Sequence, residues 1–233
     1  TLDRWGIGKD LLQAKFPRLI HCRISGFGAD GPHGGHPGYD AIIQAMTGMM
    51  AATGSQQSGP TRIGVALVDM TTGLYATVGI LMALAERERS GKGQFLETTL
   101  FETGLAIMHP HTANFFFTGK PPALTGNEHP NLVPYSMFPA RDGDIFMGVG
   151  NDGTFRKLCR ELGKPELGTD PRFARNRDRV ANRDALRAEL VAILKDHDSE
   201  PLCRRLLAAG LPAGPVQSID KALQNEHTKF RGD

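Results

Sequence analysis

One aspartate, Asp69, stands where its side chain could act as a nucleophile. It follows the apolar run from Arg62 to Val68, which predicts a strand, and it precedes Met70 to Arg89, which predicts a long, mostly apolar helix. A carboxylate at the carboxyl end of a strand lies where α/β folds place their ligand sites. The dipole and the free N–H groups of the first helical turn keep such a carboxylate ionised. Because aspartate is a covalent nucleophile in acyl and phosphoryl transfer, the pattern predicts group transfer through Asp69.

The spacing around Asp69 also fits a purely structural role. An aspartate before a helix is a common N-cap, and it stabilises its helix by about 1 kcal/mol. Elsewhere, His109 and His111 are two residues apart without a third ligand, so they predict no metal site.

The elements that would position Asp69 alternate between helix and strand. Apolar spacing and Gly or Pro breaks predict these elements in order: helix 8–16, strand 19–24, a Gly- and Pro-rich loop to residue 38, helix 39–53, strand 94–99 and helix 101–117. Strand and helix in alternation indicate an α/β layer. Residues 1–118 are therefore predicted to form part of a large, Rossmann-like α/β domain.

The pattern changes after Phe117. Residues 119–135 are rich in Pro, Gly and Asn and predict a linker or active-site loop, because long loops without structure of their own are usually functional or linking. A strand at 144–149 and helices at 154–162, 184–195 and 200–209 follow. Residues 136–233 are predicted to form a smaller α+β domain.

The composition is that of an ordinary globular protein. The 233 residues are 40% hydrophobic and 22% charged, and a net charge of +2 with scattered basic residues does not predict nucleic-acid binding. No apolar run reaches the ~20 residues of a membrane span, and the first residues do not resemble a signal peptide. Three distant cysteines, without a C-x-x-C motif, predict neither a disulfide framework nor a zinc site. We therefore expect a cytoplasmic protein with no membrane partner.

Several ordered segments resemble the family III CoA-transferases, the CaiB/BaiF group that includes carnitine, bile-acid and formyl-CoA transferases. The resemblance covers nearly the whole chain in the family's order. It is carried by Ser25-Gly-Phe-Gly-Ala-Asp-Gly-Pro32, by Pro37-Gly-Tyr-Asp-Ala-Ile-Ile-Gln-Ala-Met-Thr-Gly48, by the Asp69 segment, by Glu86-Arg-Glu-Arg-Ser-Gly-Lys-Gly-Gln94, by Gly126-Asn-Glu-His-Pro-Asn-Leu-Val-Pro-Tyr135, by Gly148-Val-Gly-Asn-Asp152 and by Pro212-Ala-Gly-Pro-Val216.

The resemblance implies a specific chemistry. Asp69 falls on the family's catalytic aspartate, which forms an acyl anhydride and then an aspartyl-CoA thioester, without a metal. The substrates are an acyl-CoA and a free carboxylic acid. The resemblance further implies that a CoA-binding set lines the site and that a loop closes over the aspartate. The binding set is Ser25, Gly26, Phe27, Gly28 and Tyr39, and the loop set is Gly126, Asn127 and His129.

Tyr39 bears on the choice between two activities of this fold. The α-methylacyl-CoA racemases are similar to this chain and keep the aspartate, but they place a histidine where this chain has Tyr39. A racemase needs two acid/base groups, and a phenol with a pKa near 10 is poorly suited to that work at pH 7. Tyr39 therefore favours a transferase, although the nearby His36 leaves the racemase open, and Tyr39 packing at a helix start remains an alternative role.

The chain departs from the family pattern at both ends. The family's N-terminal nucleotide-binding unit and its C-terminal end have no counterpart here, so we expect a fragment of a longer enzyme. The resemblance implies that residues 136–233 contain the small domain and the start of the chain's return to the large domain. Full-length members form interlocked dimers, which predicts a homodimer for the complete protein. An inactive acyl-CoA-binding fragment is the remaining alternative. The pattern around Asn127, Pro134-Tyr135 and Gly150-Asn151 leans toward members that use succinyl-type donors.

Overall fold

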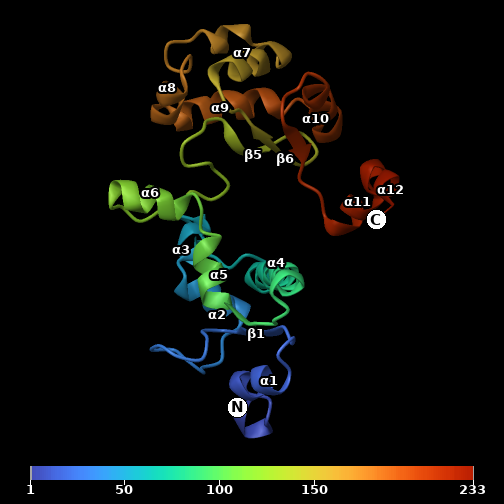
Figure 1. The fold of residues 1–233 in the computed structure, drawn as a ribbon. Helices are drawn as coiled ribbons and strands as arrows, with labels where there is room; N and C mark the ends of the chain where they lie inside the picture. The colour runs from blue at the N-terminus through green and yellow to red at the C-terminus, as the bar shows by residue number, and fades with distance from the viewer. Residues whose placement is uncertain (1, 233) are drawn as a thin grey trace. The chain divides into compact units, whose positions relative to one another are not determined.

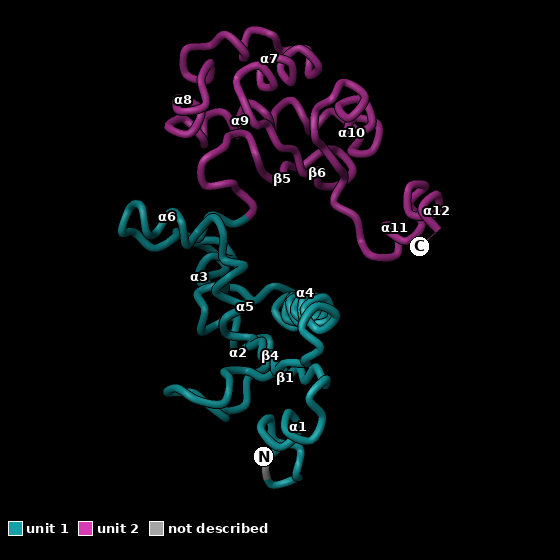
Figure 2. Tube along the Cα trace, viewed as in Figure 1, with its two compact units in different colours: residues 1–126 teal, residues 127–233 magenta. Residues whose placement is uncertain are grey.

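The structure is a computed structural model that describes residues 2–232, and the chain divides into two compact units (Figure 2). Unit 1 ends at Gly126 and unit 2 begins at Asn127. The division lies within residues 119–135, the segment that the sequence suggests as a linker.

Unit 1 contains a β–α–β arrangement (Figure 1). Strands β1 (His21–Ser25) and β4 (Phe95–Thr99) pair in parallel, with Cys22 opposite Leu96. The crossover between them includes the long helix α4 (Leu67–Ser90), which contacts both strands. The other elements are η1 (Asp3–Trp5), α1 (Lys9–Lys15), α2 (Asp40–Met46), α3 (Met49–Ala52), the short pair β2 (Gly54–Ser55) and β3 (Gly59–Pro60), α5 (Leu100–Ala106) and α6 (His111–Thr118). The predicted α/β class is confirmed.

The predicted strand from Arg62 to Val68 is wrong. Residues 61–66 are irregular, and α4 already begins at Leu67. The run is apolar enough for a strand, but no neighbouring strand pairs with it. Side chains of α2 accept the hydrogen bonds of Ile63 and Val68 instead. Asp69 therefore lies inside the first turn of a helix and does not directly follow a strand.

Two long predicted helices are each divided in two. The helix predicted for 39–53 is broken at Gly48, whose φ of +86° is left-handed and suits glycine. The helix predicted for 101–117 ends with α5 at Ala106 and resumes with α6 at His111. Pro110 lies at this break, where its missing N–H cannot continue the helical hydrogen bonds.

The core of unit 1 joins α2, α4 and α5. Its buried apolar residues are Ile43, Met49, Val68, Leu100 and Met108. A Cβ on Gly104 of α5 would lie 2.9 Å from the Cγ2 of Thr47, so the two segments approach closely because Gly104 has no side chain. This packing places α5 directly against the C-terminal end of α2.

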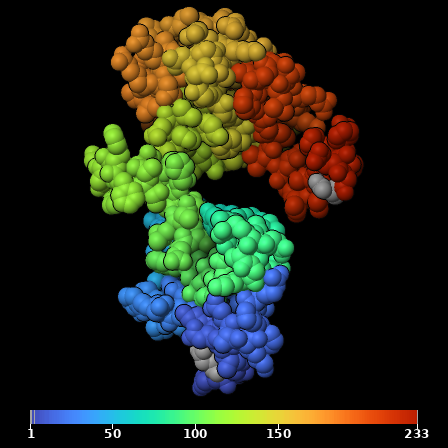
Figure 3. Space-filling model, in the orientation of Figure 1, coloured from blue at the N-terminus to red at the C-terminus, as the bar shows by residue number. Residues whose placement is uncertain are grey.

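Helix α4 is apolar on the side that unit 1 does not cover. Its exposed apolar side chains include Met70, Leu74, Val78, Leu81 and Met82, and the helix lies at the visible surface in Figure 3. Among residues 2–232, α4 alone is long and apolar enough to cross a membrane by length and composition, with 22% of its most apolar window buried. The sequence holds no unbroken apolar run of this length, because polar residues interrupt the helix. Core helices of soluble proteins pass the same test, so it does not establish a membrane span.

Unit 2 is a three-stranded antiparallel sheet with helices around it. The strand order is β5 (Tyr135–Pro139), β6 (Asp144–Gly148) and β7 (Ala213–Pro215). The helices are α7 (Asp152–Glu161), η2 (Pro165–Gly168), α8 (Asn176–Ala181), α9 (Arg183–Leu194), α10 (Ser199–Ala208), α11 (Ile219–Gln224) and α12 (Glu226–Arg231). A continuous core of buried residues, including Ile145, Phe155 and Leu190, joins the sheet to α7, α9 and α10, whereas α11 and α12 contain no buried residues. The smaller α+β fold agrees with the sequence prediction.

Two buried thiols make the stability of unit 2 sensitive to alkaline pH. Burial raises the pKa of both Cys159 and Cys203 to about 11. Both pKa values lie above the unfolded value of ~8.5, so the stabilisation is fully present below that value and is lost as the pH rises toward 11. We expect the free energy of unfolding to fall between about pH 9 and pH 11, by up to about 3 kcal/mol for each thiol.

Urea unfolding followed by circular dichroism across this pH range tests the expectation. The double variant C159A/C203A should lose this part of the alkaline decline, whatever its stability at neutral pH. Cys22 lies in β1 of unit 1, so C22A serves as the control and should keep the decline in unit 2. Parallel alkaline declines in the wild type and the double variant would contradict the prediction.

Candidate functional site

The carboxylate of Asp69 lies on the exposed side of the first turn of α4. Ala66 is the N-cap of this helix and makes no side-chain capping bond, so Asp69 is the third helical residue and is not the cap. The alternative role of Asp69 as an N-cap is therefore wrong. The partial positive charge of the helix N-terminus stabilises the ionised form of a carboxylate at this position. The structure thus presents an accessible carboxylate at the start of a helix.

The start of α4 is held by two polar residues of α2, Asp40 and Gln44, which are both buried. The Oδ2 of Asp40 accepts hydrogen bonds from the backbone N–H groups of Val68 at 2.8 Å and of Asp69 at 3.3 Å. Gln44 donates to Asp40 Oδ1 at 2.5 Å, and its own Oε1 accepts from the N–H of Ile63 at 2.9 Å. Two side chains one turn apart on α2 therefore fix both the segment before α4 and its first turn.

The loop after β1 meets the chain that leads into α2. A Cβ on Gly26 would lie 2.7 Å from the Cα of Gly38, so the two backbones are in direct contact. The carbonyl of Gly26 accepts from the N–H of Phe101, and Ser25 Oγ accepts from the N–H of Gly28, whose φ is +87°. The resemblance places these glycines in the CoA-binding set. For Gly26, the approach that the structure shows is to Gly38 of the same chain.

Phe27 and Tyr39 differ in their surroundings. Phe27 packs against the core of unit 1, with its ring centroid 5.8 Å from that of Phe101 and 5.2 Å from that of His33. Tyr39 is the N-cap residue of α2 and is 76% exposed, so it does not pack at the helix start. Both neighbours of Tyr39 in the chain are held in place. Gly38 contacts Gly26, and Asp40 accepts from the N–H of Asp69. Residues 25–28 and 69 are thus linked through the two neighbours of Tyr39 in the chain, by the contact of Gly26 with Gly38 and by the hydrogen bond of Asp69 with Asp40.

Replacing Gly26 by alanine tests this framework. The added methyl group would collide with backbone atoms that cannot rotate away, and we expect a loss of about 1–3 kcal/mol in unfolding free energy, as in other overpacked sites. A Cβ on Gly64 would meet nothing within 4 Å, so G64A is the matched control and should stay within about 0.5 kcal/mol of the wild type. Thermal unfolding of both variants decides the point, and equal effects would remove the argument for close approach.

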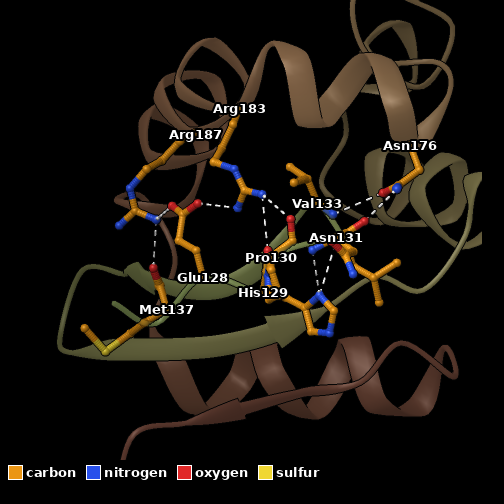
Figure 4. Close-up of polar contacts among 10 residues, drawn as sticks. Glu128, His129, Pro130, Asn131, Val133, Met137, Asn176, Arg183 and Arg187 are labelled. Carbon is orange, nitrogen blue, oxygen red and sulfur yellow. Dashed lines mark hydrogen bonds and ion pairs between the residues drawn. The ribbon is translucent and has the colours of Figure 1, made fainter. Parts of the chain in front are cut away.

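The predicted loop residues divide between the units. Gly126, with φ +62°, donates its N–H to the carbonyl of Gly54 at 2.6 Å within unit 1. Asn127 and His129 belong to unit 2, where Asn127 Nδ2 donates to the sulfur of Met137 at 3.6 Å. His129 Nδ1 accepts from the N–H groups of Asn131 and Leu132 at 3.0 and 3.2 Å (Figure 4). His129 therefore shapes its own loop through the backbone.

The sequence analysis missed the ion pairs that hold this loop. Glu128 pairs with Arg183 and, at 3.6 Å, with Arg187, and both arginines belong to α9 (Figure 4). Arg183 also donates to the carbonyl of His129 at 3.2 Å, and Arg187 donates to that of Met137 at 3.0 Å. Glu128 lay inside a matched family segment, but its partners are 55 and 59 positions along the chain, too far for a local pattern to reveal. The loop after Asn127 is therefore attached to α9.

Within residues 2–232, no group of three or more His, Cys, Asp or Glu side chains is arranged to hold a metal ion.

Comparison with known proteins extends these observations. The profile of CoA-transferase family III matches residues 1–233, the full length of the chain. The chain belongs to CoA-transferase family III. It is 40% identical over 232 residues to an acetyl-CoA:oxalate CoA-transferase of Acetobacter aceti, covering 99% of this chain and 60% of that protein. It is 36% identical to a succinate–glutarate CoA-transferase of Agrobacterium fabrum, covering 99% of this chain and 58% of the relative.

A solved structure agrees with the fold. The crystal structure of a CAIB/BAIF family protein from Brucella suis superimposes with a TM-score of 0.85 and 41% identity, over 99% of this chain and 61% of that one. The chain therefore spans about 60% of the length of the curated relatives and the structure that it matches.

Proposed function

We propose that the complete protein transfers CoA from an acyl-CoA thioester to a free carboxylic acid, with Asp69 as the nucleophile. The observation that carries the proposal is the exposed carboxylate of Asp69 in the first turn of α4, in a chain of CoA-transferase family III. The backbone at the start of that helix is held by Asp40 and Gln44. A carboxylate of this kind can act as a covalent nucleophile.

The proposed cycle alternates two covalent states of Asp69. The carboxylate attacks the thioester carbonyl, the C–S bond breaks, and an acyl–aspartyl anhydride and CoA thiolate form. The thiolate then attacks the aspartyl carbonyl, the C–O bond breaks, and the donor acid leaves from an aspartyl-CoA thioester. An incoming carboxylate reverses both steps and leaves as the new thioester. No proton is gained or lost, and the acyl group stays activated throughout, so the scheme requires no metal.

The proposed substrates are small carboxylic acids and their CoA esters. The names of the relatives include oxalate, succinate, glutarate and D-citramalate, and each of these is a dicarboxylate. We propose a small dicarboxylic acid as one partner. Ser25, Gly26, Phe27, Gly28 and Tyr39 are proposed to contact the thioester. We propose Gly126, Asn127 and His129 for the loop that shields the anhydride, and a homodimer for the complete protein.

The alternative activity in this fold is α-methylacyl-CoA racemisation. Tyr39, which is exposed at the start of α2, argues against it because a phenol is a poor base at pH 7. Exchange of a substrate α-proton with deuterated solvent, without transfer of CoA, would favour the racemase.

Peptide mass spectrometry tests the proposal directly. The full natural chain is incubated with succinyl-CoA, with and without hydroxylamine, and its peptides are mapped. A CoA adduct or a hydroxamate on Asp69 supports the transferase. An unmodified Asp69, under conditions where succinyl-CoA binding is measured separately, would overturn it. The same assay on a fragment of residues 1–233 separates an active fragment from one that only binds acyl-CoA.

A further inference from the structure

Asp40 has an unusual combination of burial and partners. The residue is 8% exposed, and the three groups that donate to its carboxylate are all N–H groups: Gln44 Nε2 and the backbone amides of Val68 and Asp69. Burying a carboxylate is costly unless it is well hydrogen-bonded. The three N–H donors therefore stabilise the buried carboxylate, and two of them belong to the first turn of α4.

The bonds of Asp40 complete the N-terminus of α4. The first N–H groups of a helix have no partner within it. In α4, the N–H of Leu67 donates to Val65 and that of Met70 to Ala66, so the amides between them, those of Val68 and Asp69, depend on Asp40. Since the N-cap residue Ala66 makes no side-chain bond, the cap comes from α2, 28 residues earlier in the chain.

From this geometry we infer that Asp40 is a positioning residue for Asp69, acting through the backbone of Asp69 itself. The inference rests on the proposed function, because it concerns the same nucleophile. The hydrogen bonds fix the N–H of Asp69 and thus the direction in which its Cα–Cβ bond leaves the helix. A misplacement of about 1 Å at a reacting group can lower a rate by about 100-fold. Gln44 supports the arrangement by holding Asp40 and Ile63 together.

The chain offers a matched pair of variants. In D40N, the new amide donor must face either Gln44 Nε2 or the amides of α4, so at least one N–H in this network loses its acceptor. In D40N/Q44E, the amide oxygen introduced at position 40 again accepts from α4, and the amide nitrogen donates to the carboxylate introduced at position 44. The second oxygen of that carboxylate accepts from Ile63. The double variant restores the hydrogen bonds while moving the negative charge one turn along α2.

The experiment combines two measurements on the full natural chain. The first is the rate of adduct formation on Asp69 with succinyl-CoA, together with succinyl-CoA binding, and the second is amide hydrogen exchange in residues 63–69. We expect D40N to form the adduct about 10- to 100-fold more slowly with binding retained, and to exchange faster in residues 63–69. D40N/Q44E should recover both the rate and the protection.

The outcomes separate the two proposals. Wild-type adduct rates in a D40N variant with lost protection would overturn the positioning role. So would a double variant that regains protection but stays as slow as D40N. If the wild type forms no adduct at all, the proposed function fails, and the exchange data then decide whether Asp40 orders the start of α4.

Discussion

Replacing Asp69 by asparagine should abolish CoA transfer while leaving the protein folded. The amide is close in size to the carboxylate but is not a nucleophile at neutral pH, so neither the anhydride nor the aspartyl-CoA thioester can form. We expect kcat to fall by at least about 10³-fold, as is usual when a covalent nucleophile is removed. Because the side chain is exposed, the loss in unfolding free energy should stay within about 1 kcal/mol, the scale of a charge at a helix N-terminus.

Steady-state transfer from succinyl-CoA to a dicarboxylic acid, with thermal unfolding alongside, measures both effects. D10N is the matched control, since Asp10 is also an exposed acid in the first turn of a helix of unit 1, and it should keep wild-type activity. D69E adds one methylene and displaces the carboxylate, so it should recover only a small part of the rate. A D69N variant that still transfers CoA at more than about a tenth of the wild-type rate would exclude the covalent scheme.

The position of Asp69 shows what local patterns can and cannot supply. The apolar run before it, the long helix after it and the family segments around it all lie within a short stretch of chain, and together they single out the residue. The same stretch predicts a strand that does not form. Three N–H groups of this stretch, including that of Asp69, donate to side chains of α2 that lie 19 to 29 residues away, and no local periodicity contains that information.

Gly26 and Glu128 show the same limit of local sequence patterns. The resemblance places Gly26 in the CoA-binding set, but only the structure shows that its backbone lies against that of Gly38. Glu128 lies in a segment that the sequence analysis singled out, yet its pairing with Arg183 and Arg187 depends on how α9 folds back onto the loop. Local conformation is thus predictable where a residue's partners are near in sequence. Partners that are distant along the chain can be identified only from the structure.

Arg179 is the clearest example of a residue whose partners are distant along the chain. Its replacement should strongly destabilise unit 2. It is fully buried, and its guanidinium donates to the carbonyls of Val133 at 2.6 Å and Phe173 at 2.9 Å and to Asp152 at 2.9 Å. The group also lies 4.5 Å from the ring centroid of Phe155. Burial lowers the pKa of Arg179, and the bond to Asp152 opposes that shift.

The R179M variant keeps much of the side-chain volume but removes every donor. The carbonyls of Val133 and Phe173 would lose their donor inside unit 2, and each buried acceptor left without a partner costs about 1–3 kcal/mol. The side chain of Asp152 is 41% exposed, so water can replace its lost partner and the broken ion pair adds little. R179K should recover little, since a single ammonium cannot match the planar fork that reaches three acceptors.

The control lies on the same helix. Arg177 is exposed and pairs with Asp178 beside it, so R177A should change the unfolding free energy by less than about 0.5 kcal/mol. Urea unfolding read by hydrogen exchange in the peptides of β5 and β6 reports on unit 2, because the one tryptophan, Trp5, lies in unit 1. Equal small losses in R179M and R177A would mean that the sheet and helices of unit 2 hold together without the buried guanidinium. A loss confined to R179M would show that one side chain joins the segment before β5, the turn before α8 and the first turn of α7.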